Sequence, residues 1–116
     1  MLIEVLKSKI HNAAVTKKEL YYHGSIGIDR VFMLKSRISA NQKVQVVNFN
    51  SGARFETYVI EEPQGSGEIA LYGPAARLAE IGDRVCIMAY ALIEQEQAES
   101  FKPEIVVLKD NNKLEP

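Results

Sequence analysis

The segment KVQVVNFNSGARFETYVI, residues 43–60, has the pattern of two strands joined by a turn. In Lys43–Phe49 and Arg54–Ile60, β-branched and aromatic residues recur in near alternation with polar ones, which is typical of half-buried strands. Asn50-Ser51-Gly52 has the composition of a hairpin turn. The segment therefore predicts a strand, a tight turn and a returning strand.

Similar short strand patterns and turn signals follow one another on both sides of this segment. The other predicted extended segments are Leu2–Ile10, Tyr21–Ile28, Glu68–Tyr72, Arg84–Leu92 and Glu104–Leu108. Asp29 and Pro74 are residue types that begin short helices, and Thr16–Glu19 has capping-box spacing for one helical turn. Many short strands with frequent turns predict a mainly β protein, a small closed β-barrel with short helices.

The length of the chain predicts its domain organisation, and its charge balance argues against some classes of partner. A chain of 116 residues with no repeat or long linker predicts one domain over 1–116, and residues 109–116 look like a frayed tail. Fourteen basic and 15 acidic residues argue against nucleic acid or an anionic membrane as the main partner. No segment has the length of a membrane span and the N-terminus lacks a signal-peptide pattern, so we expect a cytoplasmic protein.

The cysteine and histidine residues of the sequence form no recognisable metal-binding motif. Cys86 is the only cysteine, which excludes an internal disulfide and a cysteine-based metal cluster, and its apolar surroundings predict a buried structural thiol. His11 and His23 are the only histidines, and their separation fits no familiar metal-ligand spacing. We therefore expect no metal site.

Two Gly-Ser bonds, Gly24-Ser25 and Gly65-Ser66, raise the question of self-cleavage. In such a bond the serine hydroxyl can attack the glycine carbonyl, and the resulting ester eliminates to dehydroalanine, which water converts into a pyruvoyl group. This ketone forms a Schiff base with an amine and accepts electrons. Gly65-Ser66 lies in a segment with the composition of a surface turn, and the dipeptide alone does not establish cleavage at either bond.

Polar residues on two predicted strands are further candidates. Alternation places Lys7 and Lys9 on one face of the first strand, where two solvated lysines are the simplest interpretation. Arg54 and Tyr58 share a face of a later strand, either as an exposed polar surface or as a carboxylate clamp and a proton donor. Thr57 faces away from Tyr58, so a common site would need a bulge or contributions to different parts.

Several separate motifs, agreeing in order and spacing, resemble the bacterial aspartate 1-decarboxylases. They are LKSKIH (6–11), VT (15–16), LYYHGSIGID (20–29), NSGARFETY (50–58) and IGD (81–83). The resemblance extends in register from about Leu6 to Asn112 and favours cleavage at Gly24-Ser25 over Gly65-Ser66.

The resemblance implies a fold, a cofactor and a reaction. It implies a double-psi β-barrel, a homotetramer with active sites between subunits, and a precursor cut between Gly24 and Ser25. The cofactor would be a covalent pyruvoyl group derived from Ser25, without a metal. The reaction would be decarboxylation of L-aspartate to β-alanine for pantothenate and coenzyme A synthesis.

The resemblance also assigns roles to residues of this chain. Lys9 and Arg54 match residues that meet the substrate carboxylates, Tyr58 the proton donor, Thr57 a residue of self-processing and the substrate site, and Gly73 and Ala75 a loop lining the pocket. Two cations and a ketone suit the two carboxylates and the amine of aspartate. The residues leave open which cation holds which carboxylate.

The pocket loop departs from the pattern of the family. The family usually has Asn-Gly-Ala-Ala-Ala, whereas this chain has Tyr72-Gly73-Pro74-Ala75-Ala76. Tyr72 replaces an amide and Pro74 removes a backbone N–H donor, so we expect altered cleavage or substrate binding without a change of fold. A non-catalytic ligand-binding barrel with the bond intact is the alternative. A third hypothesis is a related pyruvoyl enzyme that acts on a different amino acid. The pair of cations, Lys9 and Arg54, favours a substrate with two carboxylates over a substrate with one.

Overall fold

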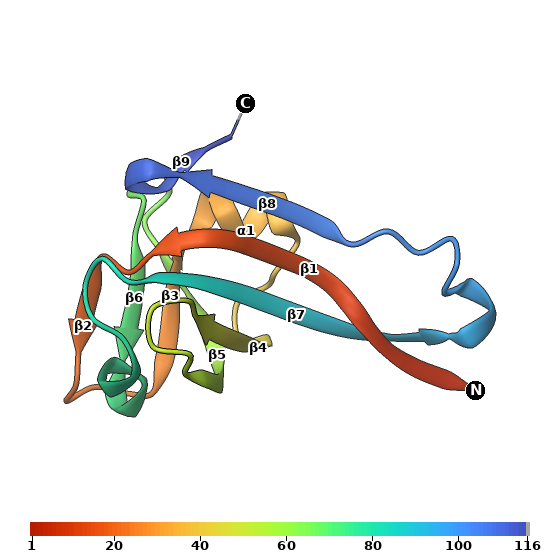
Figure 1. Ribbon diagram of the computed structural model, residues 1–116, viewed down its shortest axis with the longest axis horizontal. Coiled ribbons are helices and arrows are strands. Elements are labelled where there is room, and N and C mark those ends of the chain that lie inside the picture. The colour runs from red at the N-terminus through yellow and green to blue at the C-terminus, as the bar shows by residue number, and fades with distance from the viewer. Residues whose placement is uncertain (116) are drawn as a thin grey trace.

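The computed structural model describes residues 1–115 and consists mainly of strands, with one short α-helix and three 3₁₀ turns (Figure 1). The strands are β1 (Leu2–Ala14), β2 (Lys17–Glu19), β3 (Ser25–Asp29), β4 (Lys43–Asn48), β5 (Arg54–Glu62), β6 (Ile69–Tyr72), β7 (Arg84–Glu94), β8 (Glu104–Lys109) and β9 (Lys113–Leu114). The helical elements are α1 (Arg30–Ser36), η1 (Gly73–Leu78), η2 (Gln95–Gln97) and η3 (Asp110–Asn112). The predicted mainly β class with short helices is confirmed.

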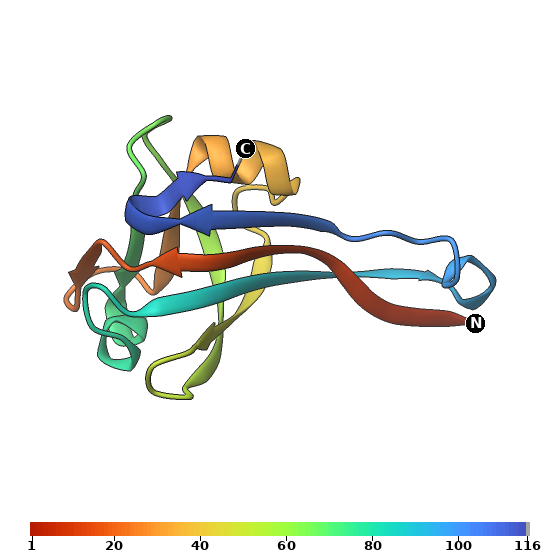
Figure 2. The same cartoon turned by 45° about the horizontal axis from the view of Figure 1, so that its top comes forward.

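The strands form one sheet in the order β2-β6-β3-β5-β4-β7-β1-β8-β9. The pairs β1/β8, β2/β6 and β3/β5 are parallel, and the other pairs are antiparallel. Only Val15 and Thr16 separate β1 from β2, so a strand near one end of the order continues directly into the strand at the other end. The sheet therefore wraps around a single core (Figure 2), in agreement with the predicted small double-psi β-barrel.

The core follows from alternation along the strands. Its largest fully buried side chains are aliphatic and include Ile10, Ile26, Ile28, Leu71, Ile87 and Leu108. Full burial of such a side chain contributes about 1.5–3 kcal/mol each, which makes this core the main source of stability. Outside the barrel, β1 and β7 continue as a two-stranded arm that carries the N-terminus (Figure 1).

Asp29 fixes the far end of β3. Its Oδ1 accepts hydrogen bonds from the backbone N–H groups of Val31 at 2.8 Å and Gly65 at 2.9 Å, and its Oδ2 accepts one from Gly67 at 2.8 Å. The predicted helix start at Asp29 is confirmed. The same carboxylate holds the exposed turn that contains Gly65-Ser66, which is a surface turn as predicted.

Two local predictions are wrong. Residues 17–19 are extended rather than helical, because their backbone pairs in parallel with β6. The chain from 109 to 115 is not frayed, because the buried Asn112 side chain accepts from Ala14 N at 2.7 Å and donates to the carbonyl oxygens of Ala14 and Gly67 at 2.9 Å each. β9 also pairs with β8, and only Pro116 of the predicted tail lies outside the described residues.

Candidate active site

The Gly24-Ser25 bond lies at the start of β3, between β5 and β6. Ser25 pairs with Tyr72 in the antiparallel ladder and is 1% exposed. On the other side the parallel register pairs Ile26 with Val59, the residue that directly follows Thr57 and Tyr58 on β5. Thr57 and Tyr58 therefore lie on β5 just before the point where it begins to pair with β3, which is the end of β3 that carries Ser25.

Gly73 packs directly on Gly24. A Cβ atom at Gly73 would lie 2.8 Å from Gly24 Cα and 2.9 Å from the Tyr22 carbonyl oxygen, and Gly73 has a φ of +71°. Both the space and the backbone angle require glycine here. A Cβ atom at Gly24 would lie 3.7 Å from Pro74 Cδ, so η1 covers the candidate bond from this side.

The Ser25 hydroxyl points back along the chain. Its oxygen lies 3.5 Å from the backbone oxygen of His23, to which it donates a long hydrogen bond. This contact keeps the hydroxyl on the Gly24 side of Ser25, where an attack on the Gly24 carbonyl carbon requires it to be.

Lys9 on β1 and Arg54 on β5 form a second group, with β7 and β4 between their strands. Lys9 pairs with Met88 of β7, and Arg54 pairs with Val47 of β4, which in turn pairs with Cys86 of β7. Burial raises the pKa of the Cys86 thiol above its usual value, and the positive charges of Lys9 and Arg54 offset part of this increase. The register places both cations on the face of the sheet that carries the Cys86 side chain, although three strand spacings, about 14 Å, separate their backbones.

Gln45 holds the Arg54 guanidinium group. Arg54 Nη1 donates to Gln45 Oε1 at 2.8 Å, and the Tyr90 hydroxyl donates to the same oxygen at 3.1 Å. Neither Gln45 nor Tyr90 was identified from the sequence as part of the site. Gln45 lies opposite Glu56 in the hairpin, and Glu56 and Arg54 lie on the same face of β5 because they are two residues apart. The predicted hairpin over residues 43–60 was therefore enough to predict that Gln45 and Arg54 share a face.

A bulge in β1 changes which residues share a face with Lys9. Leu6 pairs with Tyr90 and Ser8 with Ala89, so Lys7 is the extra residue. Because Tyr90 and Met88 lie on the same face of β7, Leu6 and Lys9 share a face, and the prediction that Lys7 shares it with Lys9 is wrong. The Lys7 ammonium group donates instead to the Arg37 carbonyl oxygen at the end of α1.

Thr57 and Tyr58 point to opposite faces of β5, as predicted. The pairing with β4 is continuous from Arg54 to Tyr58, so no bulge reorients them. Tyr58 is 39% exposed on the outer face, whereas Thr57 is half-buried opposite Val44. The side chain of Ala75 belongs to the core, so Ala75 can line a pocket only through its backbone.

The candidate residues thus form two groups in one chain. Gly24, Ser25 and Gly73 gather at the start of β3, and Thr57 and Tyr58 directly precede Val59, the β5 residue that pairs with Ile26. Lys9 and Arg54 lie on the face of the sheet that carries Cys86. Arg54 and Tyr58 are four residues apart on β5, a backbone distance of about 13 Å. A ligand that contacts both groups must span this distance or find the missing group on another chain.

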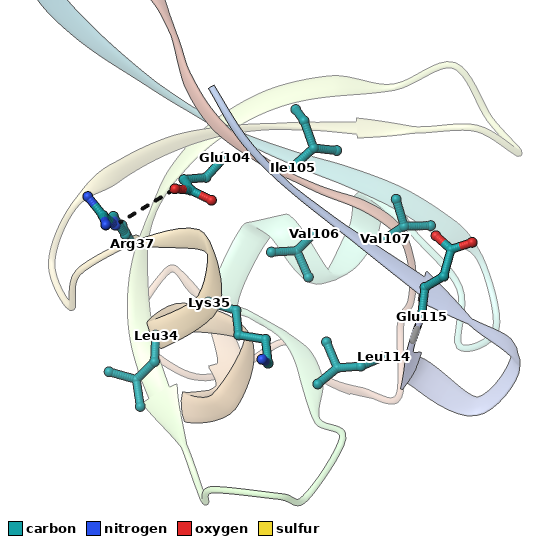
Figure 3. Close-up of a pocket in the computed structure, with 9 residues that line it drawn as sticks. All are labelled: Leu34, Lys35, Arg37, Glu104, Ile105, Val106, Val107, Leu114 and Glu115. Atoms are coloured by element: carbon teal, nitrogen blue, oxygen red, sulfur yellow. Dashed lines mark ion pairs between the residues drawn. The ribbon is translucent and has the colours of Figure 1, made fainter. Parts of the chain in front are cut away.

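A groove of about 810 Å³ contains no candidate residue. It lies between α1 and β8, where Arg37 and Glu104 form an ion pair at 3.9 Å (Figure 3). A smaller groove of about 390 Å³ is lined by Lys43, Gln45, Glu56 and Tyr90 and lies on the face of the sheet that carries Arg54 and Tyr58.

Within residues 1–115, no group of three or more histidine, cysteine, aspartate and glutamate side chains could hold a metal ion. In the same part of the chain, no helix has the length and apolar character needed to cross a membrane.

Comparisons with known proteins agree over nearly the whole chain. The sequence model of one family, Aspartate decarboxylase, matches residues 1–115. The aspartate 1-decarboxylase of Caldicellulosiruptor saccharolyticus is 57% identical over 98% of this chain and 89% of its own length. That of Cytophaga hutchinsonii is 52% identical over 98% and 99%, respectively. A rationally designed protein, mkDPBB_sym_86, resembles 68% of this chain and 91% of its own with a TM-score of 0.49 and 16% identity. The chain belongs to the aspartate decarboxylase family.

Proposed function

We propose that this protein converts L-aspartate to β-alanine and carbon dioxide, with a pyruvoyl group that it makes by cutting itself between Gly24 and Ser25. Membership of the aspartate decarboxylase family supports the reaction. The observation that best supports self-cleavage is the close contact between Gly73 and Gly24, next to the buried Ser25 residue. Such packing holds one peptide bond in one orientation, which an intramolecular attack requires.

The proposed self-cleavage takes three steps and consumes one water molecule. Ser25 Oγ bonds to the Gly24 carbonyl carbon, the bond from that carbon to Ser25 N breaks, and the hydroxyl proton passes to this nitrogen. Loss of the Ser25 Cα proton then breaks the bond from Cβ to Oγ and releases the Gly24 carboxylate. Water replaces the nitrogen, ammonia leaves, and the larger chain begins with a pyruvoyl group.

The residues around Ser25 fit such a group. Gly24 carries no side chain over the bond, and the hollow at Gly73 would be filled by a single Cβ atom. The pyruvoyl group would supply a ketone that takes the substrate amine and draws electrons away from the breaking carbon–carbon bond.

The remaining groups act on the substrate directly. Lys9 and Arg54 would bind its two carboxylates, with Arg54 presenting its remaining N–H donors beside the one held by Gln45. The partly exposed Tyr58 hydroxyl would deliver a proton to the carbon that loses carbon dioxide.

A homotetramer with sites between subunits would unite the two groups of residues. The separation of Lys9 and Arg54 from Ser25 supports this arrangement, as do exposed apolar side chains near the cleavage position and on the arm. Tyr21 is 92% exposed just before the cleavage position, and Leu92 is 64% exposed on the β1/β7 arm. The product β-alanine would then enter pantothenate and coenzyme A synthesis in the cytoplasm.

The test is the intact mass of the purified protein under denaturing conditions. We expect pieces of 24 and 92 residues, the larger blocked to N-terminal sequencing, together with release of β-alanine from L-aspartate. A single chain that stays uncut on warming would overturn the proposal in favour of a non-catalytic barrel that binds a ligand with the bond intact.

A further inference from the structure

Tyr72 is directed away from the cleavage position and is bound to a residue two strands away. Its hydroxyl donates to Glu62 Oε2 at 2.6 Å, although β3 lies between β6, which carries Tyr72, and β5, which carries Glu62. Tyr72 is 5% exposed. The amide expected at this position from the family pattern is therefore replaced by a side chain with a dedicated partner.

Gly27 makes this link across β3 sterically feasible. A Cβ atom at Gly27 would overlap the Glu62 carboxylate and would lie 2.8 Å from its Cδ. Gly27 has a negative φ, so its backbone conformation does not require glycine. The missing side chain is thus explained by the close approach of Glu62, and Gly27, Glu62 and Tyr72 form one arrangement.

The other side of the Tyr72 ring contacts the segment that leads to Gly24. The Tyr22 ring lies 4.9 Å from the Tyr72 ring, and Lys17 Nζ lies 5.7 Å from its centroid. Burial, followed by the hydrogen bond to Glu62, raises the pKa of the Tyr72 hydroxyl, so it stays protonated and remains a donor.

We propose that Glu62 and Tyr72 form a positioning pair that holds Gly73 against Gly24 and thereby sets the rate of self-cleavage at Gly24-Ser25. This inference rests on the proposed function. Neither residue is assigned a contact with a reacting atom, so both act through the backbone. Tyr72 pairs with Ser25 and directly precedes Gly73, so its anchor limits the movement of both sides of the bond. A displacement of about 1 Å at a reacting group can cost a hundredfold in rate.

The experiment measures cleavage from the start of synthesis in a cell-free translation reaction, by intact mass over time. We expect Tyr72→Phe and Glu62→Ala each to slow cleavage by about tenfold or more. We expect the double variant to be no slower than the slower single variant, because both substitutions remove the same link. Glu62→Gln keeps an acceptor of the same length and should cleave within about threefold of the wild-type rate.

Glu61→Gln is the matched control. It weakens the ion pair between Arg30 Nη1 and Glu61 Oε1, also 2.6 Å long, on the adjacent residue of β5. Because this exposed pair does not reach Tyr72, the control should cleave at the wild-type rate. Unfolding temperatures of all variants, measured in a Ser25→Ala background that cannot cleave, separate positioning from general loss of stability.

The outcomes distinguish this inference from the proposed function. Wild-type cleavage with slow Tyr72→Phe and Glu62→Ala variants and a rescued Glu62→Gln variant supports the pair. Cleavage of Tyr72→Phe and Glu62→Ala at the wild-type rate, or slowing of Glu62→Ala and Glu62→Gln alike in step with lower unfolding temperatures, overturns the pair alone. A wild-type chain that never cleaves overturns the proposed function itself.

Discussion

The Ser25 region and the Lys9–Arg54 region of the same sheet are built in opposite ways. Around Ser25 the chain is packed so closely that Gly73 has no room for a Cβ atom, and Ser25 is 1% exposed. Around Arg54 the chain is open, and its guanidinium group is held by one exposed hydrogen bond to Gln45. From this comparison we infer that the proposed self-cleavage would depend on steric precision within one chain, whereas the proposed substrate binding would depend on accessible charge.

The two regions are also physically connected. Asn48, at the end of β4, donates to the Leu78 carbonyl oxygen at 3.1 Å and to Asp83 Oδ2 at 2.9 Å. Leu78 ends η1, the element that begins with Gly73, whereas β4 carries the Gln45 that holds Arg54. Substitutions in each region therefore test whether the Ser25 region acts only in self-cleavage and the Lys9–Arg54 region only in substrate binding.

The largest effect is expected at the hydroxyl of Ser25. Ser25→Ala removes the attacking oxygen, so we expect complete loss of cleavage and of β-alanine formation in intact-mass and product assays. The control is Ser66→Ala, which changes the serine of the other Gly-Ser pair in an exposed turn and should cleave normally. Cleavage of the Ser25→Ala protein between residues 24 and 25 would contradict the mechanism.

The next effect tests the packing of the Ser25 region. Gly73→Ala introduces a Cβ atom 2.8 Å from Gly24 Cα, so we expect cleavage to slow by about a hundredfold or more. Gly52→Ala is matched in backbone angle, with a φ of +78° against +71°, but its Cβ atom would meet nothing within 4 Å. The control should lose about 1 kcal/mol of stability and cleave normally. Equal cleavage rates in the two variants would show that steric precision is not what the Ser25 region requires.

A smaller effect is expected in the cationic region, in turnover and not in processing. Arg54→Ala should cleave fully but raise the KM for L-aspartate by about ten- to a hundredfold, as expected for loss of a charged hydrogen bond worth about 1.5–3 kcal/mol. Lys35→Ala removes a cation from the groove of Figure 3, which no candidate residue lines, and should leave the KM unchanged. An uncut Arg54→Ala chain would mean that the two regions do not divide their roles.

The smallest effect concerns the connection through Asn48. The hydrogen bond from Asn48, followed by that from the backbone N–H of Glu80, holds the pKa of Asp83 below its usual value of 3.8. The unfolded chain therefore binds the proton first, and the stability that Asp83 contributes is present above pH 3.8 and lost as the pH falls through its lower folded value. Urea unfolding should show a smaller acid loss for Asp83→Asn than for the wild type. Parallel pH profiles would contradict this role.

Local residue patterns predicted most of the elements. Alternation in residues 43–60 predicted both strands of the hairpin, and Asp29 predicted the start of α1, because these signals act within a few residues. The same reasoning gave a helical turn at residues 17–19, where the parallel partner in β6 comes from a distant part of the chain. It missed Asn112, whose burial depends on contacts with Ala14 and Gly67.

The sequence by itself determined the β class, the candidate bond at Gly24-Ser25 and the residue types that a diacid substrate needs, because these are written in alternation, composition and motif. Only the tertiary structure decided that Gly73 lies on Gly24, that Gln45 holds Arg54, and that Tyr72 reaches Glu62 across Gly27. Each of these contacts joins different strands or loops, so its geometry exists only after the sheet has wrapped around its core.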